Sequence, residues 1–243
     1  MTSIGKYAFS NNSSLKSVTI GKNVSHMGER VFIGDKANYL VLDNLTVKST
    51  KLEDVTESNS NGQLVSPFWY VKVKSLVFDD AVTYIPSNTF NHIDLSECDV
   101  IIPANVTSIH HHAFSKTKSD KENKSNIIKS ISFAGNKVIE IGDSAFEYSE
   151  IPSGVRLPDS VENIGEKAFF NCDFYPYSKE NPLKVFLPQN LKKIQANAFA
   201  KFGNKDYYEC VQTNFAEKNK SANMYFYVPA DMQAVANNAL GRL

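Results

Sequence analysis

The chain has 243 residues, of which 42% are hydrophobic, so it is long enough to bury a continuous core. Its 26 Lys and Arg residues balance 26 Asp and Glu residues, which argues against a nucleic-acid-binding protein that relies on a strongly basic face. No run of 18 apolar residues occurs, and the first residues resemble no signal peptide, so the sequence predicts neither a membrane span nor a leader.

Short β-strands are predicted at intervals along the chain. Each follows the pattern apolar-x-x-apolar-x-apolar, in which alternation of Val, Ile and Phe favours a strand. A Pro or Gly often follows and ends it. The eight predicted strands end at Ile20, Val47, Phe78, Ile102, Phe133, Leu157, Leu187 and Val228.

A second string, Ile-Gly-x-x-Ala-Phe, alternates with the predicted strands. Four close copies begin at Ile4, Met27, Ile141 and Ile164, and Ser66-Pro67-Phe68 reads as the remnant of another. The spacing of 23 residues from Ile4 to Met27, and again from Ile141 to Ile164, defines the repeat. Longer gaps predict insertions at about 33–75, 115–127 and 203–222. Looser copies begin at Ile85, Ile109, Ile194 and Val235.

A repeat of this length with one strand cannot bury its own apolar side, so it must stack on its neighbours. The sequence therefore predicts one solenoid domain over residues 1–243, with about eight parallel strands. The Ile and Phe of the second string are expected to close the core from the opposite side. Its Gly is expected to adopt a positive φ or to allow a close approach between backbones. Unpaired strand edges at the ends of such a stack can also pair end to end.

The repeat resembles the BspA-like class of leucine-rich repeats. The best match is Val155–Cys172, and Cys172 falls in register with the cysteine of that pattern. The resemblance covers about residues 4–240 and implies a mainly β and irregular right-handed superhelix with a parallel sheet on its concave face. Because both ends fall within a repeat, we expect the chain to be a fragment of a larger protein whose signal peptide lies upstream.

The same resemblance implies a function. Proteins similar to this class are typically cell-surface or secreted proteins of host-associated bacteria and some protists, and they are associated with adhesion. The resemblance therefore implies a non-enzymatic module that binds a host or matrix protein, or another cell-surface protein. Two alternatives stay open: a structural spacer without a ligand, and a module that binds a glycan through exposed aromatic rings.

No motif points to an enzyme. The sequence lacks a glycine-rich phosphate loop, a Gly-x-Ser-x-Gly elbow and a His-Glu-x-x-His helix, so no catalytic residue and no cofactor are expected. The run His110-His111-His112 is interpreted as exposed, because adjacent side chains rarely converge on one metal ion. His26 and His92 are interpreted as surface or packing residues. The cysteines Cys98, Cys172 and Cys210 lack metal or redox spacing and are expected to be buried free thiols.

The outward side chains of the predicted sheet are the candidate binding site. Two residues per strand, between the buried positions, point to the exposed surface. They are small and polar in the first repeats and become basic and aromatic in the last three. Neighbouring parallel strands lie about 4.8 Å apart, so these side chains are expected to form a continuous patch suited to recognition. The candidate ligand-binding residues are Arg156, Lys184, Phe186, Tyr225 and Tyr227.

Overall fold

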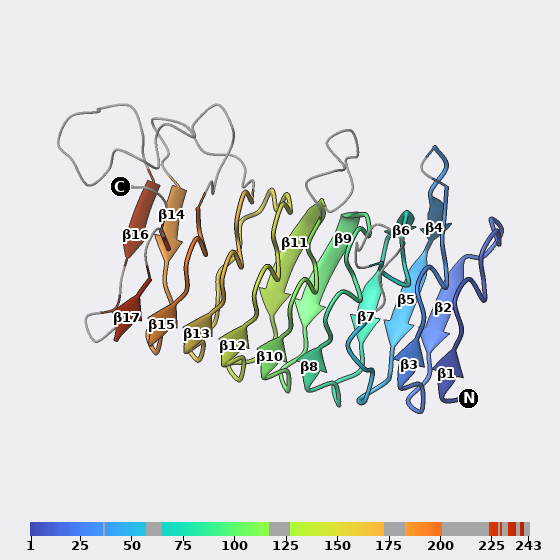
Figure 1. Ribbon diagram of the computed structural model, residues 1–243, viewed down its shortest axis with the longest axis horizontal. Helices are drawn as coiled ribbons and strands as arrows, with labels where there is room; N and C mark the ends of the chain where they lie inside the picture. Colours follow the sequence, from blue (N-terminus) through green and yellow to red (C-terminus); the bar gives the residue numbers. More distant parts are fainter. Residues whose placement is uncertain are drawn as a thin grey trace.

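The computed structural model describes residues 1–35, 37–56, 65–116, 127–172 and 183–200, together with 224–227, 229, 233–236 and 239–240. At 183, 184 and 224–227 it describes the backbone alone. No helix occurs among these residues, and hence no helix of the length and hydrophobicity that crossing a membrane requires. The chain is a β-solenoid whose turns follow one another along the long axis of the molecule (Figure 1).

The longer strands form one row along the solenoid (Figure 1). Every pairing within this row is parallel. Strand pairing aligns inward positions with inward positions and outward positions with outward positions. Val18, Leu45 and Leu76 pair with one another and are buried. The outward residues that follow them, Thr19, Thr46 and Val77, are paired in the same way. The row consists of β2 (Ser17–Ile20), β5 (Asn44–Val47), β7 (Leu76–Phe78), β9 (Leu95–Ile102), β11 (Ile128–Phe133), β14 (Leu183–Phe186) and β16 (Met224–Tyr227).

A second row of two-residue strands runs parallel to the first along the opposite edge in Figure 1. Each strand ends on the Ile, Met or Val that opens the second repeat string, and that residue is buried in every turn except the last described one. The row consists of β1 (Ser3–Ile4), β3 (His26–Met27), β8 (Tyr84–Ile85), β10 (Ser108–Ile109), β12 (Glu140–Ile141), β13 (Asn163–Ile164), β15 (Lys193–Ile194) and β17 (Ala234–Val235).

Seven of the eight predicted strands are present, but one is not. Val155–Leu157 forms no strand, although Arg156 is exposed and Leu157 is buried, as the alternating pattern requires. Gly154 adopts a positive φ of 72° directly before this segment, and Pro158 follows it, so the extended conformation is interrupted on both sides. β14 ends one residue before Leu187, and the predicted strand end Val228 lies outside the described residues.

Stacked phenylalanine rings fill the core between the two rows. Consecutive rings of this ladder are 5.1–5.9 Å apart between centroids and nearly parallel. Phe68 takes its place between Phe32 and Phe90, which confirms the remnant repeat at Ser66-Pro67-Phe68. The ladder therefore continues through a region where the sequence repeat is hardest to see. Its members are Phe9, Phe32, Phe68, Phe90, Phe114, Phe146, Phe169 and Phe199.

Of the two roles expected for the repeat glycines, the structure shows the close approach between backbones. A Cβ at Gly28 would lie 2.7 Å from the backbone nitrogen of Lys6, and one at Gly142 would lie 2.9 Å from the carbonyl oxygen of Ile109. Close approach to the preceding turn therefore favours glycine at both positions. These two glycines do not have a positive φ, which the residue two positions later, Arg30 or Ser144, adopts instead.

The predicted insertions differ in how much repeat structure they hold. Within 33–75, the structure contains β4 (Leu40–Leu42), which pairs in parallel with β6 (Val71–Val73), as well as β5 of the long row. Residues 57–64 of that insertion, residues 117–126 of the second and all of 203–222 lie outside the described residues. Cys98 and Cys172 are buried free thiols, as predicted, and Cys210 also lies outside the described residues.

Candidate binding face of the long strands

The outward side chains of the long strands make up one surface, which we call the long-strand face. Its two positions per strand are those predicted for the concave sheet. Thr19 and Ser17 on β2, and Asp99 and Ile101 on β9, are exposed, while Val18 and Val100 between them are buried. Strand pairing therefore aligns exposed side chains of successive turns in two rows.

The last turns of this face hold the five candidate residues. In the parallel pair β14–β16, Lys184 lies opposite Tyr225 and Phe186 lies opposite Tyr227. The Phe186 side chain is 55% exposed, whereas Val185 before it is partly buried against the core. Arg156, one turn earlier, is exposed as well. The backbone register thus has the predicted form, and contact between these side chains stays a prediction.

Two aliphatic residues were placed on this face from the sequence but were not chosen as candidate binding residues. Val77 on β7 is 51% exposed, and Ile101 on β9 is 55% exposed. Both occupy the same outward row as Phe186, so this row carries apolar area in its middle as well as at its C-terminal end. Alternation along the strands assigns both residues to outward positions, but the candidates were chosen for aromatic and basic side chains.

Ion pairs lie on the long-strand face and directly before its strands. Lys74 Nζ lies 2.8 Å from Asp43 Oδ1, and Lys129 Nζ lies 2.6 Å from Asp99 Oδ2. Hydrogen bonds from these lysines hold the pKa values of Asp43 and Asp99 below their ordinary value. Because opposite charges are paired side by side, this part of the face presents no field of one sign, and such exposed pairs add little to stability.

The histidine run is less exposed than predicted. His111 is exposed, but His110 is half-buried: its ring stacks on Tyr84, and Nδ1 lies 2.9 Å from Asp54 Oδ1. His112 is also half-buried, and burial together with the charge of His111 lowers its pKa to about 4. The three side chains are therefore held by different partners. In the part of the chain that the structure describes, no three His, Cys, Asp or Glu residues are grouped as a metal site requires.

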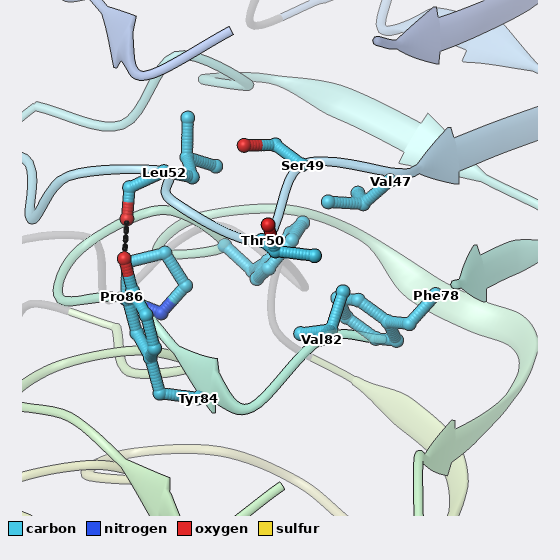
Figure 2. Close-up of a pocket in the computed structure, with 9 residues that line it drawn as sticks. Val47, Ser49, Thr50, Leu52, Phe78, Val82, Tyr84 and Pro86 are labelled. Carbon is cyan, nitrogen blue, oxygen red and sulfur yellow. Dashed lines mark hydrogen bonds between the residues drawn. The ribbon is translucent and has the colours of Figure 1, made fainter. Parts of the chain in front are cut away.

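A small pocket lies beside the segment that follows β5 (Figure 2). It encloses about 250 Å³, including space open to solvent. Of its lining residues only Tyr84 titrates; its hydroxyl donates to the Leu52 carbonyl over 2.8 Å, and burial raises its pKa. The pocket thus offers no catalytic arrangement. Its walls are Val47, Ser49, Thr50, Leu52, Phe78, Val82, Tyr84, Pro86 and Phe90.

Two solved structures are similar to this chain over most of its length. A leucine-rich cell surface protein of Faecalibacterium prausnitzii is 15% identical and has a TM-score of 0.27, with 95% of this chain and 84% of that chain covered. A leucine-rich repeat protein of Eubacterium ventriosum is 17% identical and has a TM-score of 0.21, with 99% and 80% covered. Neither is close enough to add to the fold described above. No curated protein matches the chain.

The family comparison agrees with the repeat seen in the sequence and the structure. The model of the BspA type leucine rich repeat region matches six copies over residues 1–61 and 65–201. These ranges include the turns from β1 to β15 that build the phenylalanine ladder. The chain therefore belongs to the BspA-type leucine-rich-repeat family.

Proposed function

We propose that the chain is a non-enzymatic binding module of a cell-surface or secreted protein, and that it binds a host or matrix protein through the long-strand face. The observation that carries this proposal is the exposed apolar side chain of Phe186, aligned by strand pairing with Tyr227 and beside the row of Lys184 and Tyr225. Exposed aromatic and basic residues in one patch are typical of protein interfaces.

The architecture of the solenoid supports a role in binding rather than in catalysis. Its repeated apolar residues are accounted for by the core, and its described pocket holds no cluster of titratable groups. Parallel stacking instead produces an extended surface on which side chains from many turns lie in rows, which suits the recognition of a large partner.

The test is binding of the purified chain to a panel of matrix glycoproteins and of glycans. The variant Phe186→Ser/Tyr225→Ser/Tyr227→Ser removes aromatic area at the C-terminal turns. A matched variant, Val77→Ser/Ile101→Ser, removes exposed apolar area from the same face several turns away. Circular dichroism and thermal unfolding check that both variants remain folded.

We expect saturable binding to a protein that falls about tenfold or more in the aromatic variant and stays within about twofold in the matched variant. Equal loss in both variants would contradict the C-terminal location. Competition by free sugar would favour the glycan-binding alternative. Absence of binding across the panel would favour the spacer, which needs no ligand.

A further inference from the structure

Three polar side chains meet beside β10, although one of them comes from a distant part of the chain. Ser108 lies on β10, and His110 follows two residues later, so their side chains lie on the same side of the backbone. Asp54 lies in the segment after β5, 56 residues before His110. The side chains of His110 and Asp54 are 33% and 42% exposed, and Ser108 is half-buried, so the group is accessible from solvent.

Hydrogen bonds connect these side chains in the order carboxylate, imidazole, hydroxyl. His110 Nδ1 lies 2.9 Å from Asp54 Oδ1, and His110 Nε2 lies 3.1 Å from Ser108 Oγ. Because the carboxylate accepts the Nδ1 proton, Nε2 of the neutral ring is the acceptor, and the Ser108 hydroxyl donates to it. This is the order of groups in a Ser-His-Asp triad, in which the imidazole is the base for the hydroxyl.

The carboxylate of this group is held in place and kept ionised. The Ser87 amide donates to Asp54 Oδ1 over 2.6 Å. Partial burial acts to raise the pKa of Asp54, but hydrogen bonds from Ser87 and His110 outweigh it and hold that pKa below its ordinary value. Asp54 is therefore negatively charged at neutral pH, as a group that orients an imidazole must be.

The imidazole ring is held in its orientation by an aromatic neighbour. It stacks on Tyr84, with ring centroids 5.1 Å apart and ring planes 13° from parallel. The Tyr84 hydroxyl donates in turn to the Leu52 carbonyl, the bond drawn as a dashed line in Figure 2. Stacking restricts the rotation of the ring, so both nitrogens of His110 keep their partners.

The repeat does not require this arrangement. β12 is the next strand of the row, and there the positions of Ser108 and His110 are held by Glu140 and Gly142. That turn forms the same short strand and the same core with neither a hydroxyl nor an imidazole at these positions. Packing of the solenoid therefore does not explain the group formed by Ser108, His110 and Asp54.

We propose that Ser108 is a nucleophile that accepts an acyl group from an activated ester or thioester, with His110 as its general base and Asp54 as the positioning residue. Ser108 Oγ attacks the acyl carbon, and its proton passes to His110 Nε2. A bond forms between Oγ and the acyl carbon, and the bond from that carbon to the leaving oxygen or sulfur breaks. The leaving group keeps the electron pair and takes the proton from His110.

The class of acyl donor follows from the groups that are present. A positioned base accelerates such a reaction by about 10²–10⁴-fold. Unactivated esters and amides need, in addition, donors placed to stabilise the oxyanion, whereas a good leaving group reduces that need. Glu140 lies opposite Ser108 on the neighbouring strand, and its negative charge favours a neutral donor over an anionic one. The acylated serine is a modification of the chain and does not depend on a partner of the long-strand face.

The test is reaction of the full chain with p-nitrophenyl acetate, followed by mass spectrometry of its peptides. Ser132, which is exposed on β11, is the internal control. We expect an acetyl group on Ser108, gained about 100-fold or more faster than on Ser132. Equal rates at the two serines, or acetylation of His110 in place of Ser108, would overturn the proposal and leave the group with a structural role.

The role of the base is tested by His110→Ala. We expect the rate at Ser108 to fall about 100-fold or more, and added imidazole to restore part of it, which a purely structural role does not predict. His111→Ala changes the adjacent exposed histidine and should leave the rate unchanged. A His110→Ala variant that reacts as the parent does, or that imidazole does not rescue, would contradict general-base activation.

Asp54→Asn tests the positioning role. The amide oxygen of this variant can still accept from the Ser87 amide, but the charge that orients the imidazole is lost. We expect the rate at Ser108 to fall about tenfold or more and Asp54→Glu to recover part of it, with thermal unfolding showing both variants folded. Reaction of Asp54→Asn at the rate of the parent would refute the positioning role of Asp54.

Discussion

Single residues in the turns hold conformations that are unusual for their type. The fourth residue of the second string has a φ of 50–58° in seven turns, and none of the seven is glycine. This left-handed region costs an ordinary residue about 1–2 kcal/mol. The stacked turns stabilise it, because the same residues, such as His112 and Lys167, donate backbone hydrogen bonds to the next turn. The positions concerned are Tyr7, Arg30, Asn88, His112, Ser144, Lys167 and Asn197.

His92 is a second residue whose properties depend on its surroundings. Its side chain is completely buried, and its ring stacks on Trp69 with centroids 4.0 Å apart. Burial, with smaller contributions from Lys116 and His112, lowers the pKa of His92 to about 3. His92 is therefore a packing residue, as one of the two sequence interpretations had it, and it is neutral in the folded chain above that pH.

The depressed pKa predicts acid destabilisation. Between the ordinary value of 6.5 and about 3, the unfolded chain binds a proton at His92 that the folded chain does not. The free energy of unfolding therefore falls as the pH falls through this range, by at most about 1.4 kcal/mol per pH unit for one such group. The lowered pKa of His112 makes a further contribution to this decrease in the free energy of unfolding, down to about pH 4.

His92→Phe keeps an aromatic ring on Trp69 but removes the titrating group. We expect its free energy of unfolding to fall less steeply between about pH 6.5 and about pH 4. Urea unfolding at several pH values measures it, and His26→Gln, at a partly exposed position, serves as the control. An unchanged slope in His92→Phe would contradict a neutral buried His92.

Among the elements, β9 departs furthest from the repeat. Its pairing with β11 shifts register: Ile128 and Ser130 lie opposite Leu95 and Asp99, so an advance of two residues along β11 corresponds to an advance of four along β9. On its other side β9 lies beside β7, where the Leu76 amide donates to the Cys98 sulfur over 3.2 Å. The Leu76 amide therefore has a side-chain acceptor, whereas the equivalent amide of Leu45 donates to a backbone carbonyl, that of Ser75.

This contact predicts unequal effects of two cysteine substitutions. Cys98→Ala leaves the buried Leu76 N–H without its acceptor, at a cost of about 1–3 kcal/mol in addition to the lost packing. Cys172→Ala removes a thiol of equal size that instead donates to the Phe146 carbonyl, and a carbonyl tolerates the loss of one partner better than an amide does.

Denaturant unfolding of both variants measures the difference between them. We expect Cys98→Ala to be the less stable. Equal losses would mean that the sulfur contact does not replace a backbone hydrogen bond.

At the scale of the whole molecule, each turn contacts chiefly the turns on either side of it. The stability of such a solenoid is approximately the sum of the intrinsic stabilities of its turns and of the interaction free energies between neighbouring turns. The phenylalanine ladder is the continuous part of these interfaces, since each interior ring stacks on two others. Phe114 lies near its middle, between Phe90 and Phe146, and is completely buried.

Phe114→Ala is therefore expected to weaken two interfaces at once, by about 3–5 kcal/mol in total. The turns on its two sides should then unfold in separate transitions, which hydrogen exchange in increasing urea resolves segment by segment. Val77→Ala, on the exposed face of β7, is the control and should change stability by about 0.5 kcal/mol or less. A single uniform transition in Phe114→Ala would argue against coupling through the ladder.

The sequence determined the architecture to a large extent. Period-two alternation identified seven long strands, and the recurring Ala-Phe identified the phenylalanines that close the core, including Phe68 in a decayed repeat, because a stacked core demands the same apolar residue in every turn. Repetition also identified the family. It did not reveal the second row of strands, since two residues are too few for a periodic signal, and it wrongly placed a strand at Val155–Leu157, where Gly154 turns the chain.

Only the tertiary structure decided what depends on contacts between turns. The left-handed residues, the buried and neutral state of His92 and the register shift in β9 all arise from neighbours that lie roughly a turn or more away in sequence. Insertions make those separations unequal, so no fixed spacing encodes them. The outward residues of the long-strand face could be named from alternation, but their mutual placement follows from how the turns stack.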